Sequence, residues 1–184
     1  QGHRGGKHGA TAQLLLTISL DWRVKLWDLS LLALPPAPAQ AAATSAKAAT
    51  PKPRPSGLLF ELVNPSYDYV ADVQWSPTHP AVLACVTSSN TLYVWNLLAS
   101  VTEPVDTVLV GTAADTDADA DAGVAVACTH LEWSASGKAV YVSNSLGCVY
   151  SVALRDSAVA ASPSDDAKFD SLVTQKSRSA QNEV

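Results

Sequence analysis

SLDWRVKLWD, residues 19–28, decides the fold of this chain. Its polar and apolar residues alternate on both sides of a break at Asp21 and Trp22, which predicts a strand, a tight turn and a second strand. Further along, YVADVQWSPTHP at residues 69–80 alternates in the same way and stops at two prolines. Both stretches predict β-strands joined by short turns, and therefore an all-β fold.

Three segments repeat the strand, turn and strand pattern. They are Leu15 to Leu29, Leu83 to Leu97 and Tyr141 to Leu154. A further strand ending in Trp-Ser precedes the second and third hairpins, at residues 70–76 and 129–134, and outer strands are expected at 58–63 and 106–110. Together with the Trp-Asp ending of the first hairpin, this order is typical of the blades of WD-repeat propellers.

The spacing of the repeats indicates two inserts. The intervals from Trp27 to Trp95 and from Trp75 to Trp133 both exceed the roughly 40–45 residues of a blade. Each interval contains a low-complexity run: 33–56 is rich in alanine and proline, and 113–125 alternates aspartate with small residues. Without these runs both intervals fall to about 45 residues, so we expect the inserts to be surface loops.

The length of 184 residues sets the extent of the fold. A propeller needs roughly four to eight blades to close, so we expect about two and a half blades of a seven-bladed propeller within a longer protein. Residues 1–13 form a Gly/His-rich irregular start, 14–154 hold the blades with both inserts, and 155–184 are expected to be a polar, disordered tail.

WD blades are tied together by buried hydrogen bonds among a Ser or Thr, an Asp and the strand-ending Trp. The first hairpin supplies Ser19, Asp21 and Trp27 at these positions, and the second keeps only Thr87 and Trp95. Buried polar groups must be paired to avoid a cost of about 1–3 kcal/mol each. We therefore interpret these five residues as a structural blade network and not as a binding site.

Composition argues against several functional classes. A net charge of −5 and a pI near 5.2 give no electrostatic footprint for nucleic acid, and no apolar run approaches the length of a membrane span. Cys85, Cys128 and Cys148 are odd in number and lie in apolar or strand-like runs, which favours free thiols. No nucleophile elbow, phosphate-binding loop or paired-carboxylate motif is present, so we expect no enzyme activity and no cofactor.

Two patterns resemble metal sites, but each lacks residues that such a site requires. Aspartates alternate through residues 115–121, yet a calcium loop that starts at Asp115 has Ala120 and Val126 where Gly and Glu are required. His3 and His8 lie in the Gly-rich start without a nearby cysteine or carboxylate. We expect an acidic solvated loop and an irregular start, with no metal site.

Longer motifs point to one family. DWRVKLW at 21–27, YDYVADVQWSPTHPA at 67–81 and LYVWNL at 92–97 resemble the C-terminal blades of cytoplasmic dynein intermediate chains. The run from Asp72 to Pro80 is the most specific, because generic WD blades do not share it. The resemblance covers roughly residues 14–154 apart from the inserts.

This resemblance implies a non-catalytic scaffold in a microtubule motor complex of the cytoplasm. Its propeller would dock on the dynein heavy chain, and an N-terminal region outside this chain would hold light chains and dynactin. Tyr67, Asp68 and Tyr69 are candidate partner contacts, since aromatic residues in loops often anchor interfaces. The alternative is that both tyrosines pack against neighbouring blades. A generic WD-repeat adaptor, or an axonemal or intraflagellar-transport intermediate chain, are the alternative functions.

Overall fold

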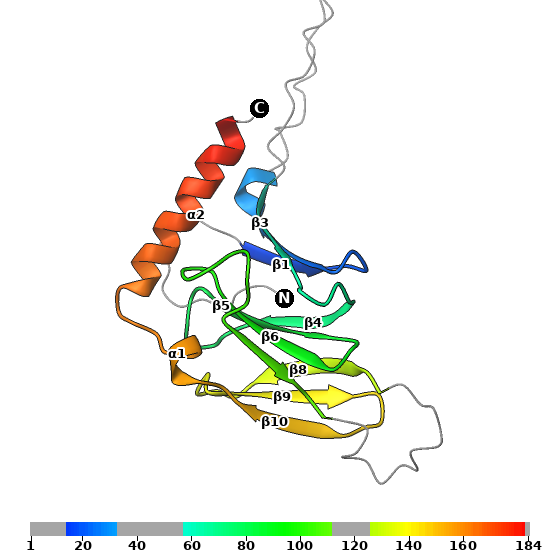
Figure 1. The fold of residues 1–184 in the computed structure, drawn as a ribbon. Helices are drawn as coiled ribbons and strands as arrows, with labels where there is room; N and C mark the ends of the chain where they lie inside the picture. Colours follow the sequence, from blue (N-terminus) through cyan, green and yellow to red (C-terminus); the bar gives the residue numbers. More distant parts are fainter. Residues whose placement is uncertain (1–13, 33–56, 112–125, 183–184) are drawn as a thin grey trace, which may run out of the picture.

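A computed structural model describes residues 14–32, 57–111 and 126–182. The predicted inserts and the Gly/His-rich start, with His3, His8 and the aspartates at 115–121, lie outside this description. The described residues form three antiparallel sheets that lie side by side, with helices at one end of the strands (Figure 1). The all-β expectation is therefore confirmed for the sheet-forming part of the chain.

Each sheet is built from consecutive strands with short connections. Sheet A contains β1, β2 and β3; sheet B contains β4, β5, β6 and β7; sheet C contains β8, β9 and β10. The bounds are β1 Leu14–Ile18, β2 Arg23–Asp28, β3 Leu58–Val63, β4 Val70–Trp75, β5 Val82–Thr87, β6 Thr91–Asn96, β7 Asp106–Leu109, β8 Cys128–Trp133, β9 Ala139–Asn144 and β10 Val149–Ala153. All three predicted hairpins, both Trp-Ser strands and both outer strands are present.

Two apolar cores hold the sheets together. The first fills the space between sheets A and B and includes Leu26, Leu62 and Leu83, and the second lies between sheets B and C around Val94 and Leu131. Sheet B supplies one face to each core, so all six residues of β5 are buried. This burial on both faces explains why β5 reads as a continuous apolar run, whereas β2 alternates.

Strands β4 and β8 are joined by polar contacts across the gap between sheets B and C. The Asp72 carboxylate accepts a hydrogen bond from the Leu131 backbone N–H at 3.1 Å and pairs with His130. The Trp133 indole N–H donates to the backbone carbonyl of Gln74 at 3.2 Å. Because these bonds join residues of opposite sheets, they fix how far one sheet can slide along the other.

The predicted disordered tail is wrong for most of its length. After the short helix α1, Asp156–Val159, the chain forms an 18-residue helix α2, Asp165–Asn182. Phe169 and Val173 on one face of α2 are buried in the first core, and the Phe169 ring meets Trp75 edge-on with centroids 6.1 Å apart. The sequence of α2 is too polar to indicate a helix by itself, because its narrow apolar stripe is stabilised only by the sheets.

No helix in the described residues is long and apolar enough to cross a membrane.

Asp72→Ala is expected to lower the free energy of unfolding of the intact protein by about 1–3 kcal/mol, because the buried Leu131 N–H loses its acceptor. Asp72→Asn keeps an acceptor oxygen and should cost less. Urea denaturation measures both, with Asp156→Ala as a control, since Asp156 forms only an exposed pair with Lys138. Equal, negligible losses for all three variants would contradict the proposed role of Asp72.

Candidate functional site

Four exposed apolar side chains gather at one end of sheet A. They come from the β1–β2 turn and the β3–β4 connection, which lie on the same side of the molecule and away from α2 (Figure 1). Their exposed fractions are 74% for Leu20, 43% for Trp22, 66% for Tyr67 and 51% for Tyr69. We call these four residues the aromatic edge. Tyr67 and Tyr69 are thus at the surface of the described residues.

Trp22 and Tyr67 are held against each other by the backbone. Their rings meet edge-on, with centroids 6.2 Å apart and planes at 85°. Both residues have a positive φ, 64° for Trp22 and 52° for Tyr67, in the left-handed region that bulky side chains rarely adopt. Such strain costs about 1–3 kcal/mol per residue and concentrates at functional sites, so this pair is the best-supported candidate contact in the described structure.

Asn64 fixes the path of the β3–β4 connection. It is only 1% exposed, and its backbone N–H donates to the Trp22 carbonyl at 3.3 Å. Its side-chain oxygen accepts from the Ser66 N–H and hydroxyl, and its carbonyl accepts from the Tyr67 N–H at 3.1 Å. Pro65 follows it at the position of the turn that proline favours. The turn is therefore rigid before any partner arrives.

Asp68 joins the aromatic edge to the β5–β6 turn by hydrogen bonds. Its carboxylate accepts hydrogen bonds from the Tyr69 N–H at 2.8 Å and from the Ser88 hydroxyl at 2.7 Å, which ties the connection to the β5–β6 turn. Burial pushes the pKa of Asp68 up, but hydrogen bonds from Ser89, Ser88 and the backbone outweigh this and hold the pKa below its usual value. Asp68 is therefore charged at neutral pH, and it positions the backbone of Tyr69.

Charged residues surround the aromatic edge. Asp21 pairs with Lys25 at 2.5 Å, and Arg23 pairs with Glu61 across β2 and β3. The hydrogen bond from Lys25 is the main reason that the pKa of Asp21 lies below its usual value. The site thus has an apolar centre and a polar rim, which is the usual layout of a protein interface.

The predicted blade network is only partly assembled. The Trp27 indole donates to the Thr17 hydroxyl at 2.8 Å, whereas Ser19 is exposed and Asp21 bonds to Lys25. In the described residues the Trp27 indole thus bonds to Thr17 on the neighbouring strand, and the predicted bonds among Ser19, Asp21 and Trp27 are not seen there. The prediction overlooked Thr17, although the alternation of the strand could have identified it.

The second hairpin shows a different polar arrangement. The Thr87 and Ser89 hydroxyls share a hydrogen bond of 3.1 Å, while the buried Trp95 indole nitrogen has no hydrogen-bond partner among the described residues. Strand pairing places Cys85 where the first hairpin has Thr17. A thiol is a weaker acceptor than a hydroxyl, so the second hairpin depends more on apolar burial.

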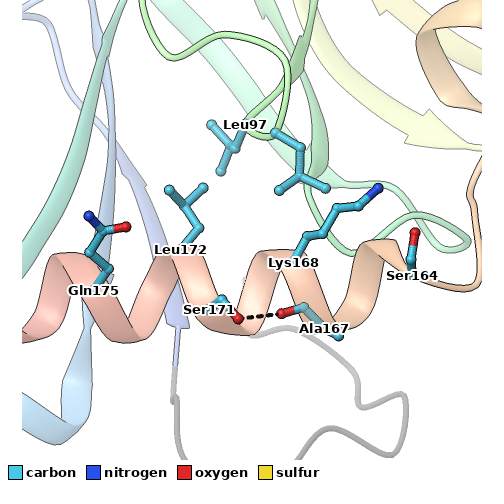
Figure 2. Close-up of a pocket in the computed structure, with 8 residues that line it drawn as sticks. Leu97, Ser164, Ala167, Lys168, Ser171, Leu172 and Gln175 are labelled. Atoms are coloured by element: carbon cyan, nitrogen blue, oxygen red, sulfur yellow. Dashed lines mark hydrogen bonds between the residues drawn. The ribbon is translucent and has the colours of Figure 1, made fainter.

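An open groove of about 560 Å³ lies between α2 and the loop after β6 (Figure 2). Leu97, Leu98 and Leu172 line its apolar part. Two of its polar groups are already used within the protein: Lys168 pairs with Asp165 at 3.0 Å, and the Ser171 hydroxyl donates to the Ala167 carbonyl at 2.8 Å. This groove therefore has fewer free groups for contact with a partner than the aromatic edge.

In the described part of the chain, no group of three or more His, Cys, Asp or Glu side chains could hold a metal ion.

Known proteins resemble this chain in sequence. No family model matches the chain. The cytoplasmic dynein 1 intermediate chain of Drosophila melanogaster is 31% identical to it over 137 residues, which is 74% of this chain. The chain is a relative of the cytoplasmic dynein intermediate chains. The resemblance deduced from the motifs is confirmed, and the matched residues span 15% of the length of the Drosophila intermediate chain.

Two of the four aromatic-edge residues, Leu20 and Trp22, were not predicted as contacts. Trp22 belongs to the DWRVKLW motif that identified the dynein intermediate chain resemblance, where it was treated as part of a hairpin. A large aromatic residue in the short β1–β2 turn, residues 19–22, was the available signal, because turns more often carry Gly, Asn or Asp. Its exposure follows from the backbone conformation, which the sequence alone does not give.

Tyr67→Gly is expected to leave the free energy of unfolding unchanged or to raise it by up to about 1 kcal/mol, because glycine adopts a positive φ without strain. Tyr69→Gly is the matched control: Tyr69 is also exposed but its φ is not positive, so this variant should lose roughly 0.5–1 kcal/mol. Thermal melting of the two variants compares them. Equal losses in both would show that Tyr67 is not strained.

Proposed function

We propose that this chain forms part of the WD-repeat propeller of a dynein intermediate chain and docks on the dynein heavy chain through the aromatic edge. The observation that carries this proposal is the 31% identity to the Drosophila intermediate chain. Sheets A, B and C would be consecutive blades, about two and a half of seven. The protein would be a non-catalytic scaffold that supports cargo attachment and minus-end-directed transport.

The sheet order supports the assignment of blades. Sheet B has four strands in sequence order, which is the composition of a complete propeller blade. Its first strand β4 lies against β8, the first strand of sheet C, as inner strands of adjacent blades do. Sheet A holds the last three strands of the blade before it, and sheet C the first three of the blade after it.

The physical properties of the aromatic edge suit docking. A few desolvated aromatic residues supply most of the binding free energy of typical interfaces. Trp22 and Tyr67 are already fixed in place by the Asn64 turn. These two residues therefore lose little conformational entropy when a partner binds. Leu20 and Tyr69, in the same two connections, are also exposed.

Other parts of the proposal rest on the family alone. Light chains and dynactin would bind to an N-terminal region outside this chain, and the complex would act at microtubules in the cytoplasm. Residues 14–154 would form the propeller portion. The blade network residues would stabilise this portion without touching a partner.

Two alternatives come from the same motifs. A generic WD-repeat adaptor would use the aromatic edge for a partner outside the motor complex. An axonemal or intraflagellar-transport intermediate chain would bind a different heavy chain through the same surface. Identification of the heavy chain that co-purifies with the intact protein distinguishes them.

Trp22→Ala together with Tyr67→Ala is expected to weaken co-purification of the heavy chain with the intact protein by roughly ten- to a hundredfold, as loss of an interface hot spot does. Tyr141→Ala is the control, since Tyr141 is 44% exposed on sheet C, away from the aromatic edge. Titration of tagged intact protein against purified heavy-chain tail measures the affinity. Failure of the unmodified protein to bind any heavy chain would refute the proposed function. Equal affinity in all variants would refute only the docking surface.

A further inference from the structure

The two halves of α2 are attached to the sheets in different ways. In the first half, Asp165, Phe169 and Val173 are buried. Beyond Val173, none of residues 174–180 is buried. Two contacts hold this second half: the Lys176 ammonium lies 5.4 Å from the centre of the Phe60 ring, and the Ser177 hydroxyl donates to Asp28 at 2.7 Å.

Asp28 is an unusual partner for an exposed helix. It ends β2, is only 3% exposed, and uses both carboxylate oxygens as acceptors. One oxygen accepts from the Ser30 N–H at 2.9 Å and from the Ser30 hydroxyl at 2.5 Å, and the other accepts from Ser177. A buried carboxylate needs such donors, because an unpaired one is costly. The Ser177 hydroxyl is therefore required to be a donor as long as the helix is docked.

We propose that Ser177 is a phosphorylation site and that its phosphorylation releases the second half of α2 from sheet A. The modifying enzyme would be a protein kinase that selects basic flanking residues, since Lys176 and Arg178 enclose the serine. The Ser177 oxygen attacks the terminal phosphorus of a nucleoside triphosphate, and the bond to the departing nucleoside diphosphate breaks. The hydroxyl proton passes to a base of the kinase.

The phosphate changes the contact with Asp28 in two ways. It replaces the hydroxyl that donates to the second carboxylate oxygen, and it places a charge of about −1.5 to −2 beside a buried carboxylate. Repulsion between two anions is strong where water is excluded. Lys176 can follow the phosphate outward, because its own side chain is exposed.

Release is limited to the second half of the helix. Phe169 remains packed on Trp75, and Asp165 remains 3.4 Å from the buried His79. The first half therefore stays anchored, and the helix can dock again after dephosphorylation. Access for the kinase follows from the same asymmetry, because a helix end without buried residues opens at low free-energy cost.

Hydrogen exchange of the intact protein tests the switch. Ser177→Glu is expected to raise amide exchange over residues 175–182 by on the order of tenfold, with a smaller change over 165–172. Ser179→Glu is the matched control: it adds the same charge on the exposed face, two residues away, where the Ser179 hydroxyl bonds only to the Gln175 carbonyl. Asp28→Asn combined with Ser177→Glu should restore protection, because the repelling charge is gone.

Modification is tested separately with the intact protein, ATP and a basic-directed protein kinase such as protein kinase C. Mass spectrometry should find phosphate on Ser177, and the phosphorylated protein should show the same faster exchange over 175–182. Absence of phosphate on Ser177, or equal exchange in Ser177→Glu and Ser179→Glu, would overturn the proposal. Failure of Asp28→Asn to restore protection would overturn the charge mechanism. None of these measurements requires a heavy chain, so they stand apart from the docking proposal.

Discussion

The buried side chain of Asn64 fixes the junction between sheets A and B. Its side chain and carbonyl hold the turn at Ser66 and Tyr67, and its N–H joins that turn to the Trp22 carbonyl of the β1–β2 turn, so the direction in which the chain leaves β3 and enters β4 has little freedom. A buried amide must satisfy its donors and acceptors, and few arrangements of the neighbouring backbone do so. The position of the exposed Trp22 and Tyr67 rings depends on this set of hydrogen bonds.

The strands could be predicted because their side chains alternate or run apolar over short, punctuated segments. Leu83 to Leu97 gave a clear hairpin, and the Trp-Ser endings of β4 and β8 marked strand ends correctly. Helix α2 could not be predicted, since Phe169, Leu172 and Val173 form too narrow a stripe among polar residues. Only the core between sheets A and B makes that stripe favourable.

Two of the four residues of the aromatic edge were among the contacts predicted from the sequence. Tyr67 and Tyr69 follow from a simple expectation about aromatic residues in loops. Trp22 joins them only because two separate turns adopt a left-handed backbone and bring the rings together. Similarly, the hydrogen bond of Trp27 to Thr17 depends on strand register, which a family pattern centred on Ser19 and Asp21 does not specify.

The three cysteines differ in burial, and therefore in the reactivity of their thiols. Burial raises the pKa of Cys85 to about 12 and that of Cys128 to about 11, so at neutral pH only on the order of one Cys85 in 10⁵ is a thiolate. Cys148, half-buried beside the β9–β10 turn, is the most accessible of the three. Electrophiles and oxidants will therefore meet sheet C first, and a fluorescent or spin label attached there would report on the last hairpin while the two inner cores remain unmodified.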